Sequence, residues 1–396
     1  MSKSNSLVKK ITIVIIAAAV VYAFSGALIS TLLNHIIDEF HLTGTGEGIM
    51  SSLMNVGLMV TFLVSPALQG RIKKLRMIMV STIILTVALL ICGFAGTAII
   101  FGIGSIVLGI GSGFLDGYMN STLIDLYPED STKPMGLLHG FYGIGSLVMP
   151  LILQALLLWL VWRGAYYVVA VLFIIVTVLI IVLNGKIEKA GGLKETEEQK
   201  LKFAVIKNYF CKKNNIVMFF YAILAAMAQA GIVSWVVRFV TLKYNAEATG
   251  ALCVTIFWLA ATVNRFLMPK IKMDMLKMII FGCLFMGIAM AIGIFVPNII
   301  VMCVMVGFCG LFSGHLMPGI MMIAAEGYQG NTTLTTSMMS FAFGIGRVAI
   351  PLIIAAVKNS VSLELGMLMA AIAAVLGTCC GWIVLKDRRK KQFAEK

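Results

Sequence analysis

Asp116 lies inside a long apolar stretch, where a carboxyl group is an expensive residue and therefore a candidate for chemistry. It lies nine residues before Asp125, which marks the expected cytoplasmic end of its helix. At 1.5 Å per residue this separation is about 14 Å, close to the middle of a bilayer. A carboxyl group in a low-dielectric cavity can take up a proton near neutral pH, which a proton-coupling group requires. The alternative is a structural ion pair with Arg265 or Arg347.

Other polar side chains within apolar stretches are candidates for binding a substrate. These candidates are Asn34, Asn55, Asn120, Gln229, Trp235, Arg265, His315 and Arg347. Ionisable residues in a membrane cost about 2.5–3.5 kcal/mol each on insertion scales, so they are functional candidates by default. Arg347 stands opposite Ser146 in an internal repeat, and this break in symmetry favours a substrate or counter-ion role.

Each candidate also has a structural alternative. Asn120 can form a hydrogen bond between helices, and Arg265 can extend to the membrane surface. Gln229 can pack in the core, and Trp235 can belong to an interfacial aromatic belt. For His315 the favoured interpretation is a hydrogen-bonded packing residue, with proton transfer as the alternative.

Acidic residues at two expected cytoplasmic helix ends lie opposite basic loops. We expect salt bridges that close an inner gate, formed by Arg71, Lys74, Arg76, Asp125, Lys272, Lys277 and Glu326. The alternative is solvated surface charge, worth under about 1 kcal/mol per pair.

Composition indicates the elements that must position these residues. The chain is 60% hydrophobic and only 12% charged, and its mean hydropathy is +1.00. A soluble domain carries about 25% charged residues, so most of this surface must face lipid. Apolar runs long enough to cross a membrane predict an all-α integral membrane protein with twelve spans. These lie near 11–36, 48–69, 77–96, 98–126, 135–159, 164–184, 216–242, 247–268, 276–295, 298–325, 333–357 and 364–385.

Charge placement predicts the orientation of the spans. Of 31 basic residues, 25 fall on one side of the expected membrane, and only Arg163, Lys243 and Lys358 fall on the other. This positive-inside pattern predicts a multi-pass plasma-membrane protein with both termini in the cytoplasm. It accounts for the formal charge of +14 without nucleic acid as a partner. The lipid bilayer and a small-molecule substrate are the expected partners, and a monomer is the expected state.

An internal repeat at an offset of 201 residues divides the chain into similar halves. Among its matches, Asp125 aligns with Glu326 and Pro150 with Pro351. Six spans per repeat give the halves the same orientation, and substrate sites of such parallel repeats lie near the midplane between the halves. We expect six-helix bundles over 1–184 and 215–396, with a charged cytoplasmic linker over 185–214.

The topology and repeat resemble the Major Facilitator Superfamily. Its signature loop after the second span appears here as 66–76, with the basic residues but without the acidic one. The segment 113–120, continuing to Pro128-Glu129, resembles the fourth helix of the fucose permease family. The resemblance implies proton coupling and substrate contact for Asp116. The family's sugar importers have an aspartate in the first helix where this chain offers Asn34, so the two-carboxylate coupling of those importers is not implied.

These observations predict a transporter that works by alternating access. The leading expectation is proton-coupled symport of a small polar solute such as a monosaccharide, and Na⁺ coupling stays open. Uptake or exchange of an organic anion is the second hypothesis, because intramembrane arginines leave a positive cavity. Drug efflux is the third. We find no nucleotide loop, nucleophile elbow or metal-ligand spacing, so no enzyme, cofactor or metal site is expected. Seven of the eight cysteines lie in apolar runs and are expected to be small core residues.

Overall fold

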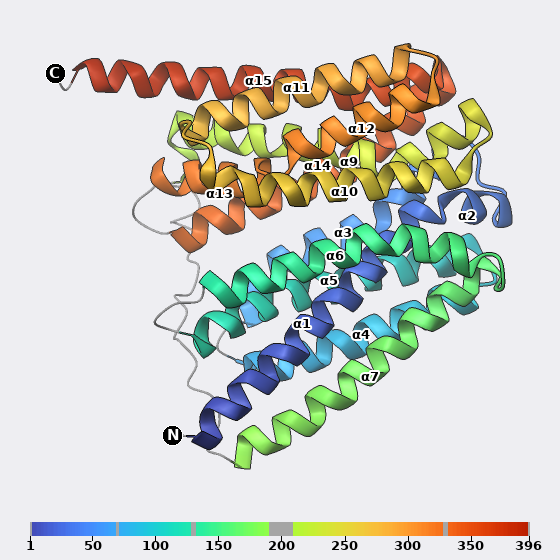
Figure 1. Ribbon diagram of the computed structural model, residues 1–396, viewed down its shortest axis with the longest axis vertical. Helices are drawn as coiled ribbons and strands as arrows, with labels where there is room; N and C mark the ends of the chain where they lie inside the picture. The colour runs from blue at the N-terminus through green and yellow to red at the C-terminus, as the bar shows by residue number, and fades with distance from the viewer. Residues whose placement is uncertain (1, 69–70, 128–131, 190–208, 328–331, 395–396) are drawn as a thin grey trace. The chain divides into compact units, whose positions relative to one another are not determined.

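The computed structural model describes residues 2–68, 71–127, 132–189, 209–327 and 332–394, with some side chains near these ends left out. Every regular element in this part of the chain is helical (Figure 1). The elements are α1 Ser2–Thr31, α2 Leu33–Glu39, α3 Gly46–Leu68, α4 Lys74–Phe94, α5 Ala98–Leu126, α6 Thr132–Leu156, α7 Trp162–Lys189, α9 Lys213–Tyr244, α10 Glu247–Leu267, η1 Met268–Lys270, α11 Met275–Phe295, α12 Ile299–Ser313, α13 Leu316–Gly327, α14 Thr332–Ser360 and α15 Leu363–Ala394.

The helices agree with the predicted all-α membrane fold. Among the described residues, eleven helical stretches are long and apolar enough to cross a membrane. The span expected near 48–69 corresponds to α3, which is not one of the eleven and whose last side chains are mostly outside the described set. The chain is therefore a multi-pass membrane protein.

Two expected spans are interrupted rather than continuous. The first is broken after Thr31, so that α1 is followed by the short α2. The tenth is broken at Gly314 and His315, between α12 and α13. The hydropathy of these runs does not reveal either break, because it indicates how long an apolar span is and not whether its helix is continuous.

Local sequence explains several helix ends. The side chain of Thr97 accepts a hydrogen bond from the Ile100 backbone N–H at the start of α5. Asn298 accepts from the Ile300 and Val301 N–H groups at the start of α12. Such N-caps satisfy donors that have no partner inside a helix.

The chain forms two compact units. Unit 1 comprises residues 1–35 and 53–200, and unit 2 comprises residues 36–52 and 201–396. The first turns of α3 therefore belong to unit 2 and the rest of α3 to unit 1. The expected bundles, 1–184 and 215–396, had placed 36–52 with the N-terminal half. The expected linker over 185–214 falls largely on 190–208, which lies outside the described residues.

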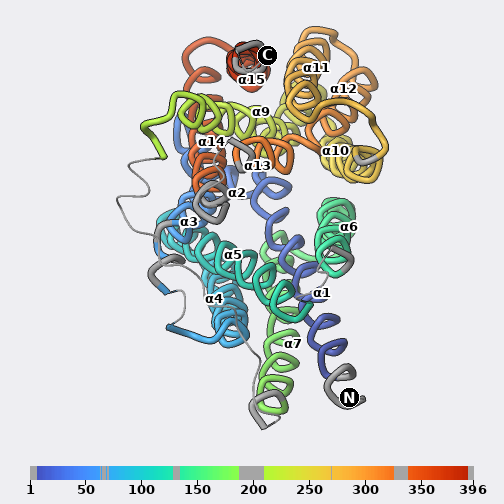
Figure 2. Tube along the Cα trace, turned by 90° about the vertical axis from the view of Figure 1, so that its left-hand side faces the viewer, coloured from blue at the N-terminus to red at the C-terminus, as the bar shows by residue number. Residues whose placement is uncertain are grey.

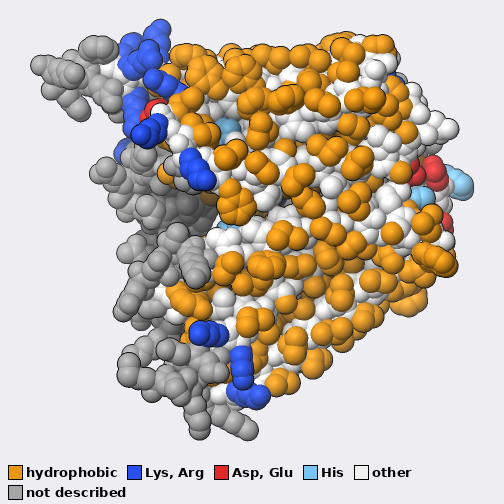
Figure 3. Space-filling model, viewed as in Figure 1, with side chains coloured by type: hydrophobic (Ala, Val, Ile, Leu, Met, Phe, Trp, Pro, Cys, Tyr) orange, Lys and Arg blue, Asp and Glu red, His pale blue; other side chains and the backbone are white. Residues whose placement is uncertain are grey.

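Each unit has a core of packed helices. In unit 1, α4 packs on α5 and α7, and α1 packs on α6, as the tube view also shows (Figure 2). Phe101, Trp162 and Tyr166 pack edge to face between α5 and α7. In unit 2, α9 packs against α14 and α15 around a core that includes Tyr221 and Trp235. Figure 3 shows hydrophobic side chains over the helix surfaces and Lys and Arg side chains gathered at helix ends, an arrangement that suits helices whose sides face lipid.

Candidate functional site

Asp116 and Asn120 form a polar pair on one face of α5. The Asn120 amide donates to the Asp116 backbone carbonyl at 2.8 Å and lies 3.4 Å from the Asp116 carboxylate Oδ1. Both side chains are half-buried. The next residue, Gly117, is exposed, and an added Cβ there would meet nothing within 4 Å. The pair thus borders open space, a setting in which a carboxyl group can exchange a proton or contact a solute.

Glycines fix the position of α5 against α3 within unit 1. A Cβ at Gly57 would overlap the Ile106 carbonyl, and a Cβ at Gly109 would overlap the Met54 carbonyl. A Cβ at Gly113 would overlap the Thr61 hydroxyl. Small residues permit such close helix approach in membranes. This contact holds the helix that carries Asp116 in place.

The other candidates in unit 1 are two asparagines. Asn34, on α2, is 4% exposed, so it contributes to the interior of the fold. Asn55, on α3, is half-buried. Both belong to the same unit as Asp116, and their role in binding a substrate stays a prediction.

Trp235 is completely buried on α9. The Lys358 ammonium lies 5.9 Å from the centre of its ring. The ring therefore packs inside unit 2 and presents no open face for stacking on a sugar. Gln229, earlier on the same helix, is half-buried and remains available as a lining residue.

An ion-pair cluster at one end of unit 2 was not expected from the sequence. The Glu47 carboxylate, in the first turn of α3, lies 2.6 Å from the Lys358 ammonium on α14. Arg238 on α9 lies 3.7 Å from the same carboxylate. The Glu47 side chain is 5% exposed, so a buried carboxylate joins three helices. Sequence patterning could not find it, because Glu47 and Lys358 are 311 positions apart.

His315 is the centre of a second polar cluster, at the break between α12 and α13. Its ring nitrogens lie 2.9 Å from Asn264 Oδ1 and 3.0 Å from the Met278 carbonyl oxygen. Arg265 Nε donates to the Gly314 carbonyl at 3.2 Å. His315 is 3% exposed. These contacts favour the packing interpretation of His315, and they give Arg265 a structural contact with the broken helix.

Arg347 occupies a different environment from the other two intramembrane arginines. It is half-buried on α14, and within the described residues no hydrogen bond or ion pair reaches it. Arg238 and Arg265, in contrast, both have the contacts given above. Its role in binding a substrate or a counter-ion stays a prediction.

One pair of the expected inner gate is present. Lys74 Nζ lies 2.9 Å from the Asp125 carboxylate, and these side chains are 10% and 4% exposed. Both residues belong to unit 1, where the pair joins α4 to α5. Arg71, Arg76, Lys272 and Lys277 are exposed, and the Glu326 side chain lies outside the described residues. The gating role of the set stays a prediction.

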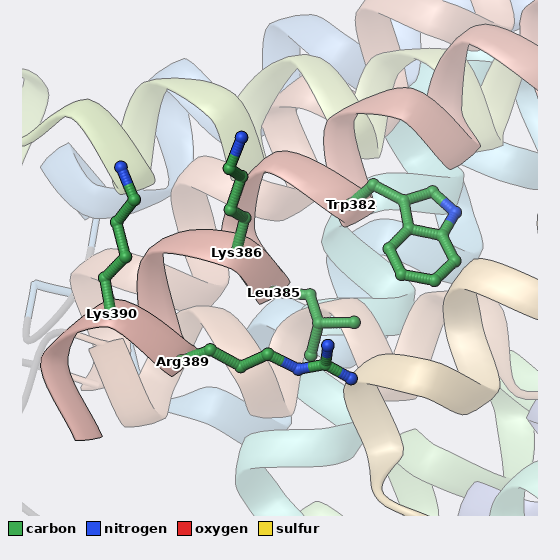
Figure 4. A pocket seen from close by; sticks show the side chains of 5 residues that line it. All are labelled: Trp382, Leu385, Lys386, Arg389 and Lys390. Carbon is green, nitrogen blue, oxygen red and sulfur yellow. The ribbon is translucent and has the colours of Figure 1, made fainter. Parts of the chain in front are cut away.

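Other site types have no support in the described part of the chain. No group of three or more His, Cys, Asp or Glu side chains is placed to hold a metal ion. A hollow on the surface of α15 is lined only by side chains of that helix (Figure 4). Its lining residues are Trp382, Leu385, Lys386, Arg389 and Lys390. An aromatic residue beside a basic cluster at a helix end is typical of the membrane interface, not of a solute site.

Comparison with known proteins identifies the family. The family model described as "Major Facilitator Superfamily" matches residues 14–277. The chain belongs to this superfamily. Its fold is therefore that of Major Facilitator transporters, as the repeat and the topology predicted. No enzymatic constellation was expected, and the superfamily is one of transporters.

A curated relative and several solved structures agree with this assignment. A "Protein TsgA homolog" from Buchnera aphidicola subsp. Acyrthosiphon pisum (strain Tuc7) is 24% identical to this chain over 60% of the chain's length. The match covers only 61% of the relative's own length. The nucleoside transporter NupG, solved in a mutant form, has a TM-score of 0.78 at 11% identity, over 95% of this chain and 99% of that one.

Two further transporter structures also share the fold. A D-xylose-proton symporter has a TM-score of 0.74 at 10% identity, over 94% of this chain and 97% of that one. The transporter FucP in its outward conformation has a TM-score of 0.64 at 14% identity, over 94% and 98%. Identities this low show the shared fold and carry no substrate assignment.

Proposed function

We propose that this protein is a proton-coupled symporter of a small polar solute, with a monosaccharide as the leading substrate class. The observation that carries the proposal is the Asp116–Asn120 pair on α5. The carboxyl group can bind the coupling proton, and the Oδ1 atom of the neighbouring Asn120 amide can accept a hydrogen bond from a solute hydroxyl. One half-buried site beside an open glycine can therefore serve ion and solute together.

The character of the similar structures supports a polar, uncharged substrate. One of them is a D-xylose-proton symporter, and another is a nucleoside transporter. Xylose and nucleosides both carry hydroxyl groups, which match the hydrogen-bonding capacity of an amide beside a carboxyl group.

An organic anion is the second candidate, and Arg347 favours it. A half-buried guanidinium with no described partner can bind a carboxylate in a bidentate arrangement. The wider positive-cavity hypothesis is weaker than the sequence suggested, because Arg238 is near the Glu47 carboxylate and Arg265 donates to the Gly314 carbonyl.

The test is uptake into proteoliposomes under an imposed pH gradient. Labelled hexoses, deoxyhexoses and sugar acids would be compared for the wild type, Asp116→Asn and Asp38→Asn. Asp38 is exposed on α2 and serves as the matched acidic control. We expect gradient-driven sugar accumulation that Asp38→Asn retains and Asp116→Asn reduces to the level of protein-free liposomes, with sugar exchange at equal pH retained.

Other results would redirect or overturn the proposal. Uptake of sugar acids alone, lost in Arg347→Gln, would favour the anion hypothesis. Wild-type uptake that does not respond to the pH gradient, together with normal uptake by Asp116→Asn, would contradict the proposal of proton coupling.

A further inference from the structure

Two cysteines far apart in the sequence meet in unit 2. Cys253 lies on α10 and Cys303 on α12, and their Sγ atoms are 3.0 Å apart. A disulfide has an S–S distance of about 2.05 Å, so the two sulfurs are about 1 Å farther apart than when bonded. The sequence predicts both to be small core residues, because nothing local links positions that are 50 residues apart.

The backbones beside this pair are held close together. A Cβ at Gly310 would overlap the Phe257 carbonyl, and a Cβ at Gly314 would overlap the Ala261 carbonyl. A Cβ at Gly307 would lie 3.0 Å from Ile256 Cγ2. Residue numbers rise together along both helices, so α10 and α12 run parallel, and both views show them side by side (Figures 1 and 2).

Gly307, Gly310 and Gly314 form a line of close contact between α12 and α10, called here the glycine seam. The two cysteines extend this seam toward the N-terminal ends of both helices. Cys303, Gly307, Gly310 and Gly314 recur at spacings of three or four, which places them on one face of the helix. At the other end of the seam, Arg265 and Asn264 contact Gly314 and His315. Because close contacts hold the helices along the seam, the sulfurs cannot separate easily, and bond formation needs only a small side-chain movement.

The pair lies at the edge of unit 2. Cys253 is buried, but Cys303 is half-buried and the adjacent Val304 is 48% exposed. In the predicted topology α10 and α12 both begin on the outer side of the membrane. Cys253 and Cys303 then lie about 6–9 Å from those ends, at 1.5 Å per residue. The outer compartment is where disulfides persist in bacteria and in secreted proteins.

We propose that Cys253 and Cys303 are a redox-active pair that forms a reversible disulfide joining α10 to α12. The two thiols lose two protons and two electrons, and one S–S bond forms. In the test the azo group of diamide takes up both protons and both electrons and becomes a hydrazine. Dithiothreitol reverses the reaction by thiol–disulfide exchange. The proposal does not depend on the substrate or on proton coupling.

The experiment uses the full-length protein in proteoliposomes treated with diamide and glutathione. Free thiols are alkylated, and peptides are mapped by mass spectrometry with and without reduction. We expect a linked peptide pair containing Cys253 and Cys303, lost in Cys253→Ser and in Cys303→Ser and retained in the control Cys92→Ser. We also expect the Tm of the oxidised wild type to rise, and to return with dithiothreitol.

Cys211 provides the internal check on the reagent, because it is exposed. A sample in which Cys211 carries glutathione while Cys253 and Cys303 both remain alkylatable would overturn the proposal. A linked pair that forms only between other cysteines would overturn it as well.

Discussion

The ammonium of Lys358 lies 2.6 Å from both carboxylate oxygens of Glu47, an ion pair between positions 311 residues apart. Arg238 adds a second cation at 3.7 Å. Breaking a buried pair leaves a charge without compensation, which costs about 3–5 kcal/mol. Glu47→Gln should therefore lower stability by that amount, measured as a fall in the midpoint of thermal unfolding in detergent.

The matched control for this variant is Glu364→Gln. Glu364 lies 3.3 Å from Lys243, but its side chain is 39% exposed. Partly exposed pairs are worth about 0–1 kcal/mol, so this change should have little effect. Equal losses for the two variants would show that burial does not strengthen the Glu47 pair.

The Lys74–Asp125 pair should behave as a buried contact between α4 and α5. Asp125→Asn should lower the unfolding midpoint, and the exchange Lys74→Asp with Asp125→Lys should recover part of the loss. Asp274→Asn is the control, because Asp274 and Arg388 are 39% and 43% exposed. The inner-gate role predicts altered uptake as well; uptake equal to wild type in the neutralised variant would leave the pair purely structural.

The contact between α3 and α5 leaves no room for a methyl group at Gly57. Gly57→Ala should force the helices apart and destabilise unit 1 by about 1–3 kcal/mol, as overpacking of a core does. The comparison is Gly136→Ala on α6, where an added Cβ meets nothing within 4 Å. The measurement is the midpoint of thermal unfolding of both variants. A Gly57→Ala variant as stable as the wild type would show that the helices can separate without loss of stability.

A substitution at Gly117 can test an effect on transport separately from an effect on folding. A Cβ there meets no other atom within 4 Å, so Gly117→Leu should leave the unfolding midpoint unchanged. If the Asp116 face lines the solute path, the same change should reduce the initial rate of solute uptake. Gly185→Leu on α7 is the control, since its added Cβ also meets nothing within 4 Å. Normal uptake by Gly117→Leu would place this face away from the solute.

His315 should act through structure rather than through proton transfer. His315→Ala removes both ring contacts and leaves the Met278 carbonyl without that donor, a loss of about 1–3 kcal/mol. Uptake per folded molecule should still respond to a pH gradient. The readout is the ratio of uptake with and without the gradient, and a ratio of one in this variant would instead make His315 part of the coupling pathway.

The sequence predicts those features that depend on neighbouring residues. Helical spacing places Asp116 and Asn120 on one face, and the structure joins them by hydrogen bonds. The acidic residue Asp125 was expected to meet the basic loop at 71–76, and it contacts Lys74. In both cases the information lies in residue type and in a short, regular spacing.

The features that the sequence does not predict depend on contacts between distant positions. Nothing local in the sequence links Glu47 to Lys358, which are 311 positions apart. Side chains of α10 form hydrogen bonds with Gly314 and His315 at the break between α12 and α13. A hydropathy profile of the tenth span carries no information about these partners, because they lie on another helix. Trp235 resembled a lining residue by type, but packing buries it completely.

The three basic residues expected on the outer side are all engaged within the fold. Arg163 donates to the carbonyls of Gly93 and Ala95. Lys243 donates to the Ile294 carbonyl, and Lys358 binds Glu47. In the predicted topology these three cations cross the bilayer when the chain is inserted, against the tendency that retains basic loops in the cytoplasm. The same charges that hinder membrane insertion of the chain later stabilise each folded unit through the contacts described above.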